Sequence, residues 1–155
     1  GYGNEAPPGL GAGAVVGARP GPTVPATAMR TTAAGRTLEI VAALGIATVQ
    51  DLGRPGLMRL GVTPGGALDR RALVLGNRLL GNDPGAAALE CAIAGPTLRF
   101  GADTLVVVAG ADFGPRLDGA DVSPWSPFIA RAGTVLSFAR PARPGTGLRC
   151  FVCLE

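Results

Sequence analysis

Residues 48–56, TVQDLGRPG, place three side chains that could bind or polarise a small molecule in one tight bend. Gln50 offers an amide donor and acceptor, Asp51 a carboxylate, and Arg54 a two-pronged donor that suits a carboxylate. In the alternative interpretation this is only a turn, in which Asp51 accepts hydrogen bonds from backbone amides and pairs with Arg54. The spacing alone favours the turn.

Two further acids stand where they could take part in proton transfer. Asp69 follows GGAL and either faces the preceding loop or caps a helix, which is the commoner role. Glu90 enters a predicted strand beside small residues, so it is the acid expected to be partly buried. A buried carboxyl is either neutral and able to carry a proton or half of a salt bridge with arginine, and the sequence leaves both open.

Two asparagines and a glycine-rich strand end are weaker candidates. Asn77 is placed on the polar side of the predicted helix, and Asn82 follows the glycine that ends this helix. Both are more often local partners of the backbone than ligands of a substrate. At residues 110–114, GADFG could let a ligand approach backbone amides, although a tight turn is the commoner use of such a sequence.

The absent residue types limit the chemistry strongly. The chain has no histidine, and all 14 of its cationic side chains are arginine. It therefore cannot by itself supply a Ser-His-Asp triad, a His-ligated zinc site, a P-loop lysine or a biotinylated lysine. General acids and bases must be Asp, Glu or a perturbed Cys, and any further chemistry must come from another chain.

The charge balance does not favour binding to nucleic acid. The net charge is only +3, and residues 1–36 contribute most of it, whereas a nucleic-acid binder needs clustered cations to neutralise phosphates. No apolar stretch approaches the length of about 18 residues that a membrane span needs, and the chain does not start like a signal peptide. We therefore predict no membrane contact and a cytoplasmic location.

The cysteines do not form a disulfide framework, because Cys91, Cys150 and Cys153 are odd in number. CFVC supplies too few ligands for a structural zinc, so we predict no metal site. Strand alternation puts Cys150 and Leu154 on one face and Phe151 and Cys153 on the other. The three cysteines are therefore predicted to be buried thiols, not redox-active residues or metal ligands.

The chain divides at about residue 37. Residues 1–36 are rich in Gly, Pro and Ala without an apolar period, which predicts a flexible arm or linker. Residues 37–43 and 46–50 have the composition of strands and, with Gly45 between them, suggest a hairpin. Residues 52–67 form a long loop rich in glycine and proline, and such loops are usually functional or mobile.

One helix and many short strands follow. Asp69 can cap a helix that Gly81 ends, and its apolar stripe is expected to consist of Ala72, Val74, Leu75, Leu79 and Leu80. Beyond Glu90, short apolar runs alternate with turn signals such as Asp118-Gly119. The uniformly apolar TLVVVAG is typical of a strand covered on both faces. The pattern predicts a mainly β domain, a barrel or sandwich with one or two helices.

Several motifs, taken in their order along the chain, resemble one known family. TVQDLGRPG, LGVTPGGALDRRALVLGNRLLGNDPGAAALE and GPTLRF are similar to the opening of allophanate hydrolase subunit 2, also called the biotin-dependent carboxyltransferase A/B domain or the C component of 5-oxoprolinase. The likeness is continuous from Ile46 to Phe100 and looser through GADFGPRLDG and PWSPF. It implies that residues 37–155 are the N-terminal lobe of a cyclophilin-like β-barrel architecture, and that this lobe is incomplete without a second one.

The resemblance also implies a function. It points to the C component of an ATP-dependent 5-oxoprolinase, which hydrolyses 5-oxo-L-proline to L-glutamate with a B-type component and a LamB/YcsF-like protein as partners, ATP acting through the complex. An alternative is the carboxyltransferase module of a urea carboxylase, with biotin carried on the lysine of a partner domain. A third is a non-catalytic protein that antagonises a kinase inhibitor, or an inactive truncated remnant.

The motif positions of the family supply the candidate site residues. They are Asp51, Asp69 and Glu90 as catalytic residues, Gln50, Arg54, Asn77 and Asn82 as substrate ligands, and Gly53, Gly61 and Gly66 as loop backbone. The physical case is best for Arg54 gripping a substrate carboxylate and for Asp51 or Asp69 handling a proton. The resemblance shifts TVQDLGRPG from a plain turn toward a contribution to a site.

Overall fold

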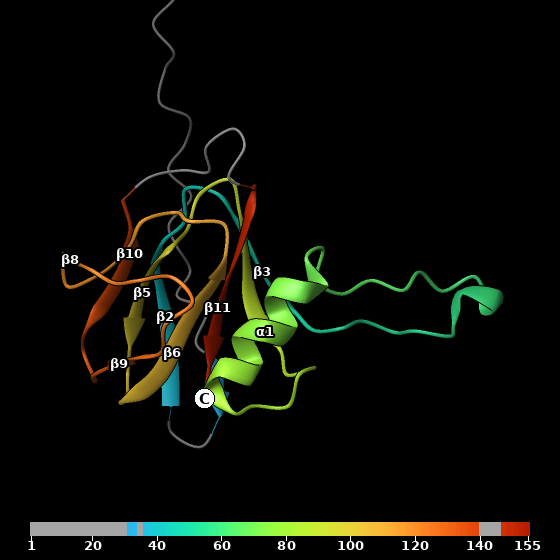
Figure 1. Cartoon of the computed structure of the whole chain (residues 1–155), viewed down its shortest axis with the longest axis horizontal. Coiled ribbons are helices and arrows are strands. Elements are labelled where there is room, and N and C mark those ends of the chain that lie inside the picture. Colours follow the sequence, from blue (N-terminus) through green and yellow to red (C-terminus); the bar gives the residue numbers. More distant parts are fainter. Residues whose placement is uncertain (1–30, 34–35, 140–146) are drawn as a thin grey trace, which may run out of the picture.

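The computed structural model describes residues 31–33, 36–139 and 147–155, and within them it contains two antiparallel sheets and one α-helix (Figure 1). The strands of the first sheet are β1 (Thr31–Ala33), β2 (Arg36–Ala42), β5 (Thr97–Phe100), β7 (Pro115–Leu117), β8 (Ala120–Asp121) and β10 (Val135–Phe138). The strands of the second sheet are β3 (Ile46–Gln50), β4 (Ala88–Ala92), β6 (Thr104–Gly110), β9 (Phe128–Ala130) and β11 (Arg149–Leu154). The helices are the 3-10 turn η1 (Met58–Leu60) and α1 (Arg70–Leu80).

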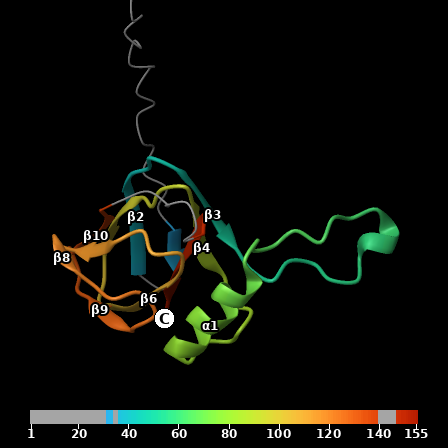
Figure 2. The ribbon, with the colours of Figure 1, turned by 45° about the horizontal axis from the view of Figure 1, so that its top comes forward.

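The two sheets enclose one core, and α1 packs on the outer face of the second sheet (Figures 1 and 2). The strand order is β1-β2-β5-β10-β7-β8 in the first sheet and β3-β4-β11-β6-β9 in the second. The predicted mainly β fold with a helix packed on it is confirmed. No helix among the described residues is long and apolar enough to span a bilayer.

The predicted hairpin between residues 37–43 and 46–50 is wrong. β2 pairs with β1 and β5, whereas β3 pairs with β4 in the other sheet. The chain crosses between the sheets at Gly45, where a Cβ would lie 2.5 Å from the carbonyl oxygen of Ala92 and 2.6 Å from that of Ala94. The glycine thus allows a close backbone approach at the crossing, instead of a turn between paired strands.

The predicted boundary at residue 37 also differs from the structure. Thr31–Ala33, which belong to the segment predicted to be flexible, form the edge strand β1 against β2. Arg36 is the first residue of β2. The rest of the predicted arm, residues 1–30 and 34–35, lies outside the described residues.

Strand β11 carries residues of two different cores on its two faces. Cys150 and Leu154 face the core between the sheets, while Phe151 and Cys153 face α1. This is the alternation that the sequence predicts, and all three cysteines are buried and free. Strand β6 is likewise covered on both faces, as its uniformly apolar composition indicates.

Helix α1 begins and ends where predicted, but its buried face is different. Asp69 is the N-cap and accepts a hydrogen bond from the Ala72 amide at 3.0 Å, and Gly81 ends the helix in a left-handed conformation. Leu75 and Leu79, expected in the buried stripe, are 48% and 44% exposed. The buried residues are Ala72, Leu73, Gly76, Asn77 and Leu80. The helix is thus rotated from the predicted orientation, so that Gly76 lies close against the sheet together with Leu73 and Leu80.

We expect Gly76→Ala to destabilise the protein by about 2 kcal/mol, although alanine favours helix. A Cβ at this position would lie 2.7 Å from the Cys153 sulfur and 2.9 Å from the Ala109 Cβ, so the helix would have to move away from the sheet. Urea unfolding measures the change. Gly76→Ala combined with Cys153→Ala should recover part of it, and a wild-type midpoint for the single variant would contradict this close packing.

Candidate functional site

Residues 52–67 leave the body as a narrow protruding loop with η1 at its far end (Figures 1 and 2). At the neck of this protruding loop, Gly53 and Gly66 have φ of +76° and +83°, and their backbones touch. A Cβ on Gly66 would lie 2.6 Å from the Gly53 nitrogen, and one on Gly53 would overlap the Pro64 carbonyl oxygen. Only glycine fits both positions, so these two residues shape the neck of the loop, while their role in a site stays a prediction.

The polar side chains at the start of the protruding loop are engaged to different degrees. The Asp51 carboxylate accepts a hydrogen bond from the Gly53 amide at 2.7 Å, as the turn interpretation predicts. Gln50 donates to the Thr48 hydroxyl at 3.1 Å. The Arg54 side chain is exposed and forms no ion pair with Asp51 or with any other described residue, so its guanidinium remains available for a ligand.

Glu90 is buried on the outer face of the second sheet, close to the N-terminal end of α1. It is 3% exposed, and its Oε1 lies 3.3 Å from Nη1 of Arg149. The Leu68 amide donates to both carboxylate oxygens, at 3.3 and 3.4 Å. The predicted burial is confirmed, and of the two alternatives the structure contains the salt bridge.

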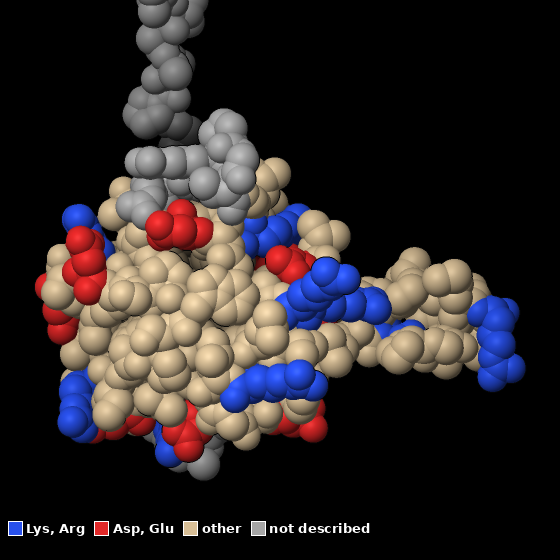
Figure 3. Space-filling model, viewed as in Figure 1, with Lys and Arg blue, Asp and Glu red and all other residues tan. Residues whose placement is uncertain are grey.

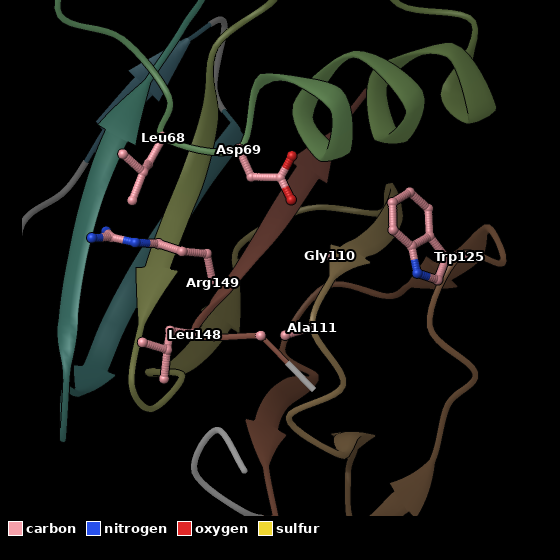
Figure 4. Close-up of a pocket in the computed structure, with 8 residues that line it drawn as sticks. Leu68, Asp69, Gly110, Ala111, Trp125, Leu148 and Arg149 are labelled. Atoms are coloured by element: carbon pink, nitrogen blue, oxygen red, sulfur yellow. The ribbon is translucent and has the colours of Figure 1, made fainter. Parts of the chain in front are cut away.

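A cavity of about 300 Å³ opens beside this ion pair (Figure 4). Its lining includes Leu68, Asp69, Gly110, Trp125, Leu148 and Arg149. In Figure 4 the Asp69 carboxylate points toward the side where Trp125 lies, whereas the Arg149 guanidinium points the opposite way. We call this space the α1 cavity. The glycine-rich strand end GADFG therefore borders this cavity through Gly110 and Ala111.

Trp125 stands in the wall of the α1 cavity in an unusual backbone conformation. Its φ is +62°, which is rare for a bulky residue. The Trp125 amide donates to the Val108 carbonyl at 2.8 Å, and the residue is 39% exposed. Strained conformations of this kind persist where the surrounding structure holds them and are concentrated at functional sites.

A second cavity has its charged groups already paired. It is lined in part by Asp103, Ile129 and Arg131 near the edge strand β9. The Asp103 carboxylate lies 2.6 Å from Arg131 and also accepts from the Ala132 amide, and these contacts lower its pKa. The α1 cavity is therefore the better candidate for a functional site.

Several predicted site residues meet around residues 66–69. The Ala67 amide donates to the Asp51 carbonyl at 2.8 Å, which ties the opening motif to this segment. Leu68 is bonded to Glu90 and precedes Asp69, so the three predicted catalytic acids surround one stretch of backbone. Gly61 is elsewhere, since it caps η1 at the end of the protruding loop.

Asn77 and Asn82 lie at the other end of α1 and make structural contacts. Asn77, placed by the sequence on the polar side of the helix, is fully buried and donates to the Ala86 carbonyl at 2.7 Å. Asn82 donates to the Asn77 side chain at 3.2 Å and to the Leu154 carbonyl at 2.8 Å. These contacts favour the local structural role over substrate binding, which stays a prediction.

Arg149 and Trp125 line the α1 cavity, and the sequence interpretation did not single them out. The alternation assigned to β11 puts Arg149 on the same face as Phe151 and Cys153. Because this face is covered, a charged side chain on it indicates that an oppositely charged or hydrogen-bonding partner is buried nearby. Trp125 is the only tryptophan of the chain and stands between two prolines, in SPWSP. An aromatic residue held between two prolines in a loop was the feature of the sequence that could have indicated a site.

Arginine predominates among the charged side chains of the face that carries α1 and the protruding loop. Figure 3 shows basic side chains over α1 and at the end of the loop. They are the exposed Arg70, Arg71 and Arg78 of α1 and Arg59 of η1. The α1 cavity thus opens in surroundings that favour negatively charged or neutral polar groups.

The chain is similar to known proteins in sequence and in structure. The family model described as carboxyltransferase domain, subdomain A and B, matches residues 60–155. The chain belongs to this carboxyltransferase family. The match includes the whole lining of the α1 cavity but begins within the protruding loop.

Relatives of this carboxyltransferase-family chain are named for more than one activity. The C component of the Haemophilus influenzae 5-oxoprolinase is 39% identical over 109 residues, which are 70% of this chain and 34% of the relative. The structure of TTHA0988 has a TM-score of 0.70 at 34% identity and covers 79% of this chain and 24% of that one. Kluyveromyces lactis urea carboxylase has a TM-score of 0.68 at 31% identity, covering 76% and 10%. The chain thus spans about a third of the curated relative.

We expect the thiols of this carboxyltransferase-family chain to be unreactive while it is folded. Burial raises the pKa of Cys153 to about 12, and a hydrogen bond with Cys91 together with burial raises the pKa of Cys150. At pH 8 an aromatic disulfide reagent should therefore detect no thiol in the folded protein and three in urea. Fast reaction of the folded protein would contradict this expectation.

The same pKa shift predicts how stability depends on pH. The neutral Cys153 thiol contributes its full stabilisation below its ordinary pKa of 9.0. Because the folded pKa is raised, this contribution is lost as the pH rises from 9.0 to about 12. Since the chain has no lysine, few other groups titrate in this range. Urea unfolding at pH 8 and pH 10.5 should show a lower midpoint at the higher pH, and Cys153→Ala should reduce the difference.

Proposed function

We propose that this chain acts as the C component of an ATP-dependent 5-oxoprolinase, which hydrolyses 5-oxo-L-proline to L-glutamate. The observation that carries the proposal is its 39% identity to the corresponding component of the Haemophilus influenzae 5-oxoprolinase over 70% of the chain. A B-type component and a LamB/YcsF-like protein would be its partners. A cytoplasmic location is part of this proposal.

The site chemistry supports a hydrolysis that is shared among several chains. Opening a lactam requires water to add to the carbonyl carbon, the ring C–N bond to break, and the leaving nitrogen to take up a proton. Among the predicted catalytic acids, Glu90 is paired with Arg149 and Asp51 holds the Gly53 amide. Asp69 borders the α1 cavity and is the acid best placed to hold or move this proton.

The residues of this chain do not suit a site for ATP of its own. The sequence has no lysine and no P-loop. The arginines exposed on α1 lie on a convex helix surface, which does not wrap a triphosphate. In this proposal ATP binds to a companion subunit, and this chain supplies substrate contacts.

A second candidate is the carboxyltransferase module of a urea carboxylase. The similarity to Kluyveromyces lactis urea carboxylase, with a TM-score of 0.68 over 76% of the chain, favours it. Biotin would then arrive on a lysine of a partner domain, because this chain has none to carry it. Biotin-dependent carboxylation of urea by the assembled complex would support this candidate over the first.

The test is ATP-dependent release of glutamate from 5-oxoproline with the companion subunits co-expressed. We expect turnover by the wild type and a fall of about 30-fold in kcat/KM for Arg54→Ala, the loss typical of a charged hydrogen bond to a carboxylate. Asp51→Ala should lower the activity as well, because it frees the Gly53 amide that positions the motif.

Arg59→Ala is the matched control, since it removes the same charge at the far end of the protruding loop. Equal activity of the wild type and the Arg54 variant would refute the role of Arg54. Absence of glutamate release with every set of companion subunits would refute the oxoprolinase assignment.

A further inference from the structure

Residues 52–80, which form the protruding loop and α1, are strongly basic. They contain five arginines and a single acid, Asp69, so their net charge is +4, whereas that of the whole chain is +3. None of these five arginines forms an ion pair among the described residues. Four arginines outside the segment do, and they are Arg99, Arg116, Arg131 and Arg149. The charge of residues 52–80 is therefore available to another molecule.

The far end of the protruding loop is apolar and exposed. Leu57, Met58 and Leu60 are 36%, 68% and 66% exposed, and η1 has no buried residue. Figure 3 shows the loop standing clear of the body. We call these three residues the apolar tip. Because they cover no core of this chain, they can be withdrawn from water only against another molecule.

Backbone hydrogen bonds hold the apolar tip in one shape. The Leu60 amide donates to the Leu57 carbonyl at 2.9 Å and closes the turn of η1. Closer to the body, the Arg54 amide donates to the Pro64 carbonyl at 2.7 Å and joins the two sides of the loop. A surface that is ordered before contact loses little conformational freedom on binding, which suits a docking element.

The outward face of α1 has the same combination of apolar and basic side chains. Leu75 and Leu79 are 48% and 44% exposed, and Arg71 and Arg78 are exposed as well. These positions are three or four residues from Leu75, so they lie on one side of the helix. We call them the outer α1 stripe. Arginine is enriched in protein interfaces, where its charge commonly lies beside an apolar centre.

We propose that the apolar tip and the outer α1 stripe are the docking surface for a companion protein that presents an apolar hollow edged by carboxylates. The tip and the leucines of the stripe would fill the hollow, and the unpaired arginines would meet the carboxylates. This inference rests on the proposed function, because the companion protein is a subunit of the same oxoprolinase.

Charge and composition favour such a companion over other partners. A two-fold contact between copies of this chain would bring a net charge of +4 against an equal charge. A surface that inserts into a membrane commonly carries aromatic anchors, and residues 52–80 contain no Phe, Trp or Tyr. Nucleic acid would neutralise the arginines but would give the apolar tip no hollow to enter.

Met58→Ser combined with Leu60→Ser tests the apolar tip. Both side chains are exposed, so the unfolding midpoint should stay at the wild-type value. Calorimetric titration uses the purified B-type component and the purified LamB/YcsF-like protein, each alone. We expect at least one to bind the wild type, and to bind the double variant at least tenfold more weakly. Ile129→Ser changes a residue of β9 that is 52% exposed and should leave the affinity unchanged.

Arg71→Glu combined with Arg78→Glu tests the charge of the outer α1 stripe. We expect at least tenfold weaker binding of the same companion protein, mainly through slower association, and a smaller effect of added NaCl than in the wild type. Arg99→Glu combined with Arg116→Glu is the control. It changes the net charge equally at exposed positions outside residues 52–80, and it should weaken binding less than threefold.

Several results would overturn the inference. One is that neither companion protein binds the wild type, and another is that either the tip variant or the stripe variant binds as tightly as the wild type. A third is a dimer of the chain, or binding to phosphatidylserine vesicles or duplex DNA, that the tip substitutions abolish. The surface would then serve a different partner.

The glutamate-release assay separates this inference from the proposed function. If the complex releases glutamate and the tip variant needs no more companion protein than the wild type for half-maximal rate, the docking surface fails and the function stands. If docking behaves as expected and no glutamate forms, the function fails and the docking surface stands. With saturating companion protein a docking variant keeps its kcat, so Arg59→Ala remains a valid control for Arg54→Ala under that condition.

Discussion

Arg149→Met is expected to lower the free energy of unfolding by about 3 kcal/mol, because it leaves the Glu90 carboxylate buried without its cation. Glu90 is 3% exposed and 3.3 Å from Arg149, while the arginine side chain keeps 35% exposure. This partial exposure of Arg149 places the expected loss near the lower end of the range for buried pairs. The Leu68 amide is the only other described partner of the carboxylate.

Two variants make the Arg149 result specific. Arg99→Met breaks the exposed pair with Glu39, at 3.4 Å, and should cost only about 0.5 kcal/mol. The double variant Glu90→Gln with Arg149→Met removes both charges and should recover most of the loss, since glutamine can still accept from the Leu68 amide. Denaturant unfolding measures all three. Equal losses of unfolding free energy for Arg149→Met and Arg99→Met would show that the buried pair stabilises the protein no more than the exposed pair.

Phe151→Ala is expected to cost about 4 kcal/mol, the usual range for removal of a buried aromatic ring. Phe151 is fully buried on the outer face of β11, where it packs in the core under α1. In register it lies beside Glu90 of β4 and Ala109 of β6. Its removal opens a cavity under the helix and should also loosen the buried ion pair.

The contrast between two aromatic residues tests this interpretation. Trp125→Gly deletes a larger ring, yet the change should cost little stability because Trp125 is 39% exposed and its positive φ is relieved by glycine. Comparison of the unfolding midpoints of both variants with that of the wild type measures the difference. Similar losses for Phe151→Ala and Trp125→Gly would contradict the assignment of Phe151 to the core and of Trp125 to the cavity wall.

The family and the fold class could be predicted from the sequence with good success, whereas the roles of the candidate site residues stay predictions. The ordered motifs indicated the family, which the match over residues 60–155 shows independently. The predicted acids Asp51, Asp69 and Glu90 do surround one backbone segment. The motif positions could not separate these from Asn77 and Asn82, whose contacts are structural. Both classes of residue stand in the same run of motifs, and only their contacts distinguish them.

The sequence by itself determined the features that depend on neighbouring residues. The cap at Asp69 and the glycine at the end of α1 act within one helical turn. The alternation of β11 follows from the strand period of two residues. The turn at Asp118-Gly119 has positive φ at both residues and joins β7 to β8, because these residue types tolerate that conformation.

Only the tertiary structure decided which distant segments meet. It placed β2 and β3 in different sheets, although they are separated by only a short connection. It brought Arg149 to Glu90 and turned Gly76, with Leu73 and Leu80, toward the sheet in place of Leu75 and Leu79. It also held Trp125 at the wall of the α1 cavity. Pairing partners, helix rotation and cavity shape depend on close packing between elements far apart in the chain, which no local pattern encodes.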